Sequence, residues 1–196
     1  MGESAIICLK NKSLLQSVKM SLAQMGIVQV IENDDPEKVV RQTHNIINAL
    51  IIIDPTEYGT NGIRVAKVLA REKTGPIVFI VSNKRLLKPV EDIIEKESIA
   101  ATYITTPISY EVLRVAVRTT AISYRKIIEL EKKLVDVNEM LAEKKKINRA
   151  KELLVKNKNL EEPEAHKLIQ KISMNTGKSM KVVAEKIIRE FSYSNT

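Results

Sequence analysis

A chain of 196 residues, 44% of them hydrophobic, is long enough for one or two domains with a buried core. It has no apolar run near the length of a membrane span, no signal-peptide pattern at residues 1–10 and a single Cys8, so we expect a cytoplasmic protein without internal disulfides. The net charge of +8 is uneven, because residues 123–196 contain 17 Lys+Arg against 11 Asp+Glu, and this favours either a polyanionic partner or a solvated helical face.

The first half of the chain alternates β-branched runs with segments of helical spacing. Strands are predicted at Ala5–Leu9, Ile27–Ile31, Ala49–Ile53, Ile77–Val81 and Thr102–Thr105. Helices are predicted at Lys12–Met25, Glu37–Ile47, Gly62–Arg71 and Val90–Glu97. Continuous apolar strands separated by helices are typical of a parallel sheet that helices cover on both faces. The sequence therefore predicts an α/β fold, with a five-stranded doubly wound parallel sheet, over residues 1–122.

One long helix is predicted from Ser109 to about residue 155, because no Gly or Pro occurs before Pro163. Within it, apolar residues recur in alternating steps of three and four, flanked by Glu and Lys. We call these five residues the seam: Ile127, Leu130, Leu134, Val137 and Leu141. This is the spacing of a coiled coil, which we assign to residues 123–146. Either a second copy of the chain, giving a homodimer, or the chain's own α/β domain covers the seam.

A small three-helix domain is predicted over residues 147–196. The end of the long helix supplies its first helix, and two more are expected at about 161–173 and 179–191. Pro163 suits a first helical turn, and Ser179 suits an N-cap. The expected core is apolar: Ile147, Ala150, Leu153, Leu154, Ala165, Leu168, Ile169, Ile172, Val182, Val183, Ile187 and Ile188. Met174 and Met180 are expected in the core or at caps.

Asp54 closes the third predicted strand, and Gly62 follows eight residues later. In this spacing the first half resembles the receiver domain of response regulators, where such an aspartate accepts a phosphoryl group. The resemblance implies an acidic pair after the first strand that holds Mg²⁺, a Ser or Thr after the fourth strand, and a Lys after the fifth. Here the segment Cys8-Leu9-Lys10-Asn11 contains no carboxylate, and Thr106 stands where the resemblance implies Lys.

The residue after the fourth strand that would sense a phosphoryl group is Ser82, or Val81 if the register is counted from Pro76. One carboxylate without an acidic pair is a poor Mg²⁺ site. We therefore expect a receiver-like domain with no metal and no cofactor, in which Asp54 is not phosphorylated in the usual way. The alternative role for Asp54 is that of a turn residue before Pro55.

The last fifty residues contain apolar positions of the expected core, with lysines between them. The residues of this pattern are Ile147, Ala150, Lys151, Leu154, Ala165, Leu168, Met174, Lys178, Val183 and Ala184. In these residues the segment resembles the ANTAR domain, an RNA-binding module of bacterial transcription antiterminators. It departs at Glu152, where that family usually has Gly, and at His166, where an aromatic residue is common. The side chains left for RNA are Arg149, Lys151, Lys156, His166, Lys171, Lys178 and Lys181.

Together the two resemblances imply an RNA-binding transcription antitermination regulator. It would bind leader-transcript hairpins, prevent termination, and be controlled through a receiver-like domain that is not phosphorylated. The expected partners are RNA, a second copy of the chain, and a sensor protein or kinase. We expect no enzyme, because no nucleophile–base pair or glycine-rich phosphate loop is present. The alternatives are a signalling or scaffold protein that binds a protein partner, and a DNA-binding response regulator, which the lack of a recognition helix rich in Arg, Asn and Gln disfavours.

Overall fold

The computed structural model describes residues 4–97 and 100–193, and the chain divides into two compact units, Met1–Glu129 and Leu130–Thr196. The boundary between the units lies inside a long helix. The expected division at residues 122 and 146 therefore stays a prediction. In the described ranges, no helix combines the length and the apolar character that crossing a membrane requires.

Among its described residues, the first unit is a five-stranded parallel sheet with helices between the strands, as predicted. The strands are β1 (Ser4–Cys8), β2 (Gln29–Asn33), β3 (Leu50–Ile53), β4 (Ile77–Val81) and β5 (Ala101–Thr105). The helices between them are α1 (Lys12–Gln24), α2 (Pro36–Asn45), α3 (Gly59–Glu72) and α4 (Leu87–Glu97), with short 3-10 turns η1 (Pro55–Tyr58) and η2 (Lys84–Leu86). The strand order β2-β1-β3-β4-β5 makes the sheet doubly wound.

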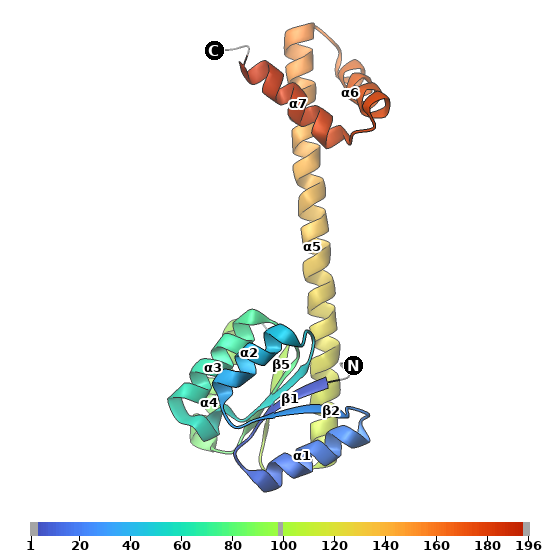
Figure 1. The fold of residues 1–196 in the computed structure, drawn as a ribbon. Helices are drawn as coiled ribbons and strands as arrows, with labels where there is room; N and C mark the ends of the chain where they lie inside the picture. Colours follow the sequence, from blue (N-terminus) through green and yellow to red (C-terminus); the bar gives the residue numbers. More distant parts are fainter. Residues whose placement is uncertain (1–3, 98–99, 194–196) are drawn as a thin grey trace. The chain divides into compact units, whose positions relative to one another are not determined.

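Helices cover both faces of this sheet, because successive strand residues point to opposite sides. On one face, Ile53 and Phe79 pack in a core with α2, α3 and α4 (Figure 1). On the other face, Ile52 and Ile80 pack in a second core with α1 and the beginning of α5 (Tyr110–Lys158). All four side chains are fully buried, so every central strand reads as a continuous apolar run.

The second strand begins two residues later than the sequence predicted. Ile27 is buried, but it lies in the connection that follows α1 and not in β2. Gly26 has a φ of 82°, and the backbone N–H of Ile27 donates to the carbonyl of Leu22 at 2.9 Å. This is a helix-terminating motif in which an apolar residue after the glycine packs back on the helix. The apolar character of Ile27 therefore reflects helix capping.

The second unit contains the end of α5, followed by α6 (Glu162–Thr176) and α7 (Met180–Tyr193). Nearby residues cap both ends of α6 and the beginning of α7, and of these caps the sequence predicted Ser179. The N–H of Glu161 donates to Oε2 of Glu164 at 2.9 Å before α6, and Gly177 ends that helix with a φ of 65°. The Ser179 hydroxyl accepts the N–H of Val182 at 3.4 Å, which confirms Ser179 as the N-cap of α7.

These three helices share one small core of buried residues: Ala150, Leu154, Ala165, Ile169, Val183, Ala184 and Ile187. Most of the predicted core is confirmed, and three assignments were wrong. Val182 is 44% exposed and Met174 is 77% exposed, while Leu153 is only half-buried and lies outside this cluster. For Val182 the reason is helical phase, because Ala184 and Ile187 point inward from α7 on the side opposite Val182.

Candidate functional site

Asp54 follows β3 at the carboxyl edge of the sheet, and it is fully buried. Its Oδ1 accepts the backbone N–H of Thr56 at 2.8 Å and the hydroxyl of Thr56 at 2.5 Å. Its Oδ2 accepts the backbone N–H of Ser82 at 3.0 Å. The Thr56 hydroxyl in turn accepts the N–H of Asn83 at 3.1 Å. Donors of the chain itself occupy both carboxylate oxygens, so Asp54 ties the loop after β3 to the loop after β4.

Gly62 explains the spacing that the sequence shows after Asp54. A Cβ at this position would lie 2.0 Å from the carbonyl oxygen of Pro55 and 2.9 Å from Cβ of Tyr58. Only glycine allows α3 to approach η1 so closely. The eight-residue interval therefore has a packing reason in this chain.

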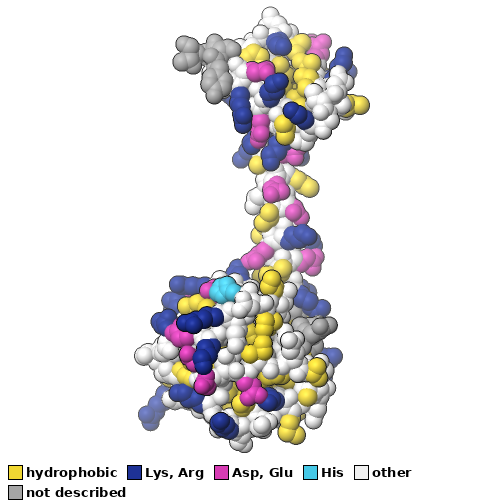
Figure 2. All heavy atoms as spheres, in the orientation of Figure 1, with side chains coloured by type: hydrophobic (Ala, Val, Ile, Leu, Met, Phe, Trp, Pro, Cys, Tyr) yellow, Lys and Arg dark blue, Asp and Glu magenta, His cyan; other side chains and the backbone are white. Residues whose placement is uncertain are grey.

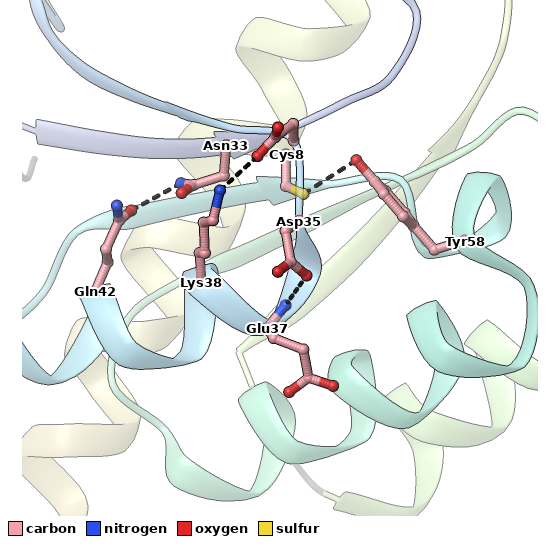
Figure 3. A network of polar contacts seen from close by, with 8 residues as sticks. Cys8, Asn33, Asp35, Glu37, Lys38, Gln42 and Tyr58 are labelled. Atoms are coloured by element: carbon pink, nitrogen blue, oxygen red, sulfur yellow. Dashed lines mark hydrogen bonds and ion pairs between the residues drawn. The ribbon is translucent and has the colours of Figure 1, made fainter.

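The segment after β1 contacts η1 through hydrogen bonds to Glu57 and through the contact of Lys10 with the Tyr58 ring. The Glu57 carboxylate accepts the backbone N–H of Lys10 at 2.6 Å and that of Asn11 at 3.2 Å. Lys10 Nζ donates to the Glu57 carbonyl at 3.0 Å and lies 4.4 Å from the centroid of the Tyr58 ring. The Cys8 thiol and the Tyr58 hydroxyl point toward each other at 3.3 Å (Figure 3). Burial raises the pKa of Cys8 to about 11, so the thiol stays protonated at neutral pH.

Asp34 and Asp35 follow β2, and both contact residues of α2. Figure 3 shows Asp35 beside Glu37. Asp35 Oδ1 accepts the N–H of Glu37 at 2.9 Å and so caps the helix. Asp34 pairs with Lys38 at 2.9 Å, and this hydrogen bond lowers the pKa of Asp34. In the ranges 4–97 and 100–193, no group of three or more His, Cys, Asp or Glu side chains is placed to hold a metal ion.

The two other receiver positions, Ser82 and Thr106, make different contacts. Ser82 contacts Asp54 through its backbone N–H, whereas Val81 ends β4 with a fully buried side chain. Thr106 donates its backbone N–H to the carbonyl of Val81 at 3.4 Å. Within the described part of the chain, no hydrogen bond joins Thr106 to Asp54. Of the two registers considered for the position after the fourth strand, the geometry thus brings Ser82 to Asp54.

The residues expected to contact RNA lie in the second unit, whose visible face in Figure 2 carries many Lys and Arg side chains. Two of the cations on α5 have acidic partners: Lys151 Nζ lies 2.7 Å from Glu162 Oε1, and Arg149 Nη1 lies 3.0 Å from Glu152 Oε2. A second group is exposed and, over the described residues, forms no ion pair: Lys156, Lys171 and Lys178. His166 is exposed on α6, and Lys181 is half-buried on α7.

A hollow of about 350 Å³ lies beside the first of these groups. It is lined by Asn148, Lys151, Glu152, Val155 and Glu162. Sequence reasoning singled out Lys151 and noticed Glu152 only as a departure from the family. It missed Asn148, Val155 and Glu162 as neighbours of that lysine. The ion pair between Lys151 and Glu162 crosses the turn between α5 and α6, and no local spacing signals such a contact.

The seam is largely exposed in the single chain. Leu130 is 59% exposed and Leu134 is 62% exposed, and Val137 and Leu141 are each at least half exposed. Ile127 is half-buried. Four large apolar side chains in steps of three and four on one helix form an apolar stripe of the kind that pairs with another helix.

Comparisons with known proteins find two likenesses in sequence. The family model of the ANTAR domain matches residues 136–188. The transcriptional regulatory protein PdtaR of Mycobacterium tuberculosis, in two strains, is 29% identical over 177 residues, covering 87% of this chain and 84% of PdtaR.

Two solved structures share the fold. The response regulator StyR matches with a TM-score of 0.62 and 12% identity, over 93% of this chain and 98% of that chain. A structure described as adenylate cyclase from Rhodopirellula baltica matches with a TM-score of 0.55 and 17% identity, over 68% of this chain and 98% of that chain. At such identities these two likenesses concern the fold alone.

Proposed function

We propose that this chain, whose residues 136–188 are an ANTAR domain joined to a receiver-like α/β domain, binds hairpins in leader transcripts and prevents transcription termination. The ANTAR domain carries this proposal, and the exposed cations around its small core support it. Folded RNA is recognised largely through its backbone, its shape and exposed loop bases, and unpaired lysines on a rigid helical scaffold suit the backbone part of that task.

We further propose that a homodimer presents two such domains. The exposed apolar seam supports this, because a second copy of α5 supplies the partner that its spacing requires. Two linked copies that each hold one hairpin bind more tightly than one, since the second contact is intramolecular. The same proposal includes the dimer contact and a cytoplasmic localisation, where nascent RNA is made.

Control in this proposal does not pass through phosphorylation of Asp54. The carboxylate is buried, both of its oxygens are hydrogen-bonded, and the described residues hold no cluster of three or more His, Cys, Asp or Glu side chains for a metal ion such as Mg²⁺. Phosphoryl transfer to a carboxylate needs an accessible oxygen and charge neutralisation at the moving group. The receiver-like domain instead suits control by a protein partner, such as a sensor that sequesters it.

Acetyl phosphate with Mg²⁺ is accordingly expected to leave the intact mass of the full chain unchanged. The same reagent applied to a receiver that has a complete acidic pair serves as the positive control. A mass increase of one phosphoryl group, mapped by peptide analysis to Asp54, would show that the loops around this residue open and would overturn this form of control.

The RNA proposal is tested by salt dependence. A hairpin enriched by the full chain from a pool of random-loop RNA hairpins should bind more tightly than duplex DNA of equal length. Lys171→Gln and Lys178→Gln should each flatten the plot of log affinity against log salt by roughly 0.7–0.9, because each true phosphate contact releases counterions. Lys171 lies in α6, where Gln has a helix propensity close to that of Lys, and Lys178 is exposed between α6 and α7, so both substitutions should retain the fold.

Lys132→Gln is the matched control, since Lys132 is an exposed residue of α5 outside the residues expected to contact RNA. An equal flattening by Lys132→Gln would mean that the cations act only as a diffuse charge. Hairpins that bind no better than duplex DNA would reject antitermination. That result would favour a DNA-binding regulator or a scaffold.

A further inference from the structure

Lys151, the lysine of the ANTAR pattern, is covered by an acidic side chain of the next helix. Its side chain is only 15% exposed and forms part of the wall of the hollow. The ammonium donates to Oε1 of Glu162 at 2.7 Å, while the Glu162 side chain itself is 73% exposed. A phosphate that approaches Lys151 through the hollow therefore meets the carboxylate of Glu162 first.

Glu152 extends the acidic rim of the same hollow. It lines the hollow with Glu162 and pairs with Arg149 at 3.0 Å. By contrast Lys171 and Lys178, on α6 and after it, are exposed and unpaired within the described residues. The second unit thus has cations that are open to any polyanion and cations that carboxylates screen.

A carboxylate and a phosphate compete for the same ammonium. The hydrogen bond from Lys151 lowers the pKa of Glu162, so Glu162 is charged at neutral pH. A phosphate brought to Lys151 either displaces this carboxylate or stays beside it, and like charges so close repel each other. An anion held by no other contact gains too little from Lys151 to offset that repulsion. A ligand that other contacts hold in place, with its phosphate or base edge at the hollow, does gain binding free energy from Lys151.

We propose that Glu162 determines specificity at the RNA interface by screening Lys151 from polyanions that lack the shape of the cognate hairpin. This inference rests on the proposed RNA-binding function. It assigns to one carboxylate a role against unwanted partners, which is a recognised way to gain specificity.

Glu162 is a suitable position for substitution, because it contributes little to folding. The box that caps α6 uses Glu161 and Glu164. The pair of Glu162 with Lys151 is open to water on the glutamate side, where the side chain is 73% exposed, so it stabilises the fold only weakly. Glu162→Gln keeps the size of the side chain and removes its charge. Circular dichroism and the urea midpoint of each variant confirm that the fold is unchanged.

The experiment measures binding of the full chain to two probes, the enriched RNA hairpin and duplex DNA of equal length. Four variants are compared with the wild type: Glu162→Gln, Lys151→Gln, the double variant, and Glu139→Gln. Glu139 is the matched control, because it is an exposed glutamate of α5 that forms no ion pair within the described chain.

Glu162→Gln should tighten duplex DNA binding roughly two- to fivefold, which is the change in affinity that one ion pair near the surface produces. It should tighten hairpin binding less. The salt slope for duplex DNA should steepen by up to about 0.9, because Lys151 then makes one more phosphate contact. In the Lys151→Gln background, Glu162→Gln should change neither quantity. Glu139→Gln should match the wild type.

Equal effects of Glu162→Gln and Glu139→Gln would reduce the role of Glu162 to net charge and overturn the inference. So would an effect of Glu162→Gln that persists without Lys151, because the glutamate would then act through another group. Failure of the RNA function has a different signature, namely a wild-type chain that enriches no hairpin and prefers none to duplex DNA.

Discussion

The double substitution of Leu134→Glu with Leu141→Glu is expected to convert a dimer of this chain into a monomer. Leu134 is 62% exposed and Leu141 is 50% exposed in the single chain, although both occupy positions where a coiled coil buries its contacts. Burial of each leucine in a second helix contributes about 1.5–3 kcal/mol, and each dimer contains both residues twice. Two glutamates on each helix also place like charges opposite one another.

Sedimentation equilibrium at micromolar concentrations measures the effect directly. Val135→Glu is the matched control, since Val135 is an exposed apolar residue of α5 that lies one position off the seam. It should leave the dimer intact. A wild-type chain that sediments as a monomer, or a Val135→Glu variant that dissociates as fully as the double variant, would contradict a seam-mediated dimer.

Ile169→Ala is expected to unfold the second unit and to abolish RNA binding. Ile169 is fully buried at the centre of the core shared by α5, α6 and α7. Truncation of a buried isoleucine costs about 2–5 kcal/mol, because it removes apolar contacts and leaves a cavity. A single core of this size supplies only about 3–5 kcal/mol of net stability, so the loss is of the same order as the total.

Urea unfolding followed by circular dichroism and limited proteolysis separates the two units in this test. The fragment of the first unit should resist protease in the variant as in the wild type. Val182→Ala is the control outside this core, because Val182 is 44% exposed on α7 and its truncation should change stability by less than about 0.5 kcal/mol. Equal losses for both substitutions would mean that the core is not organised around Ile169.

The buried strands were predictable because each is a short apolar run between turn residues. β4 has the predicted bounds, Ile77–Val81, whereas β2 was misplaced because Ile27 has the same apolar character as a strand residue and caps a helix instead. In the second unit, Val182, Val183 and Ala184 are consecutive and apolar, so periodicity alone could not choose which of them points outward. Tertiary packing decides the phase of α7.

The position of Asp54 was predictable from its spacing to Gly62, but its hydrogen bonds were not. The partner of its second oxygen, Ser82, is 28 residues away, and Glu57 reaches Lys10 over 47 residues. Such contacts depend on which loops meet at the edge of the sheet. The same limit applies to Lys151 and Glu162, which are 11 residues apart across a turn.

The Asp54 carboxylate joins the loops after β3 and β4, and this role affects how substitutions at this position are interpreted. In genetics, Asn is the usual replacement that removes a phosphorylation site, and Glu is the usual imitation of a phosphorylated one. Here an Asn amide would turn an N–H₂ toward the N–H of Ser82 or of Thr56, and a buried donor without an acceptor costs about 1–3 kcal/mol. Glu would add a methylene where the aspartate is already fully buried. A phenotype of either allele is therefore expected from damage to this loop junction alone.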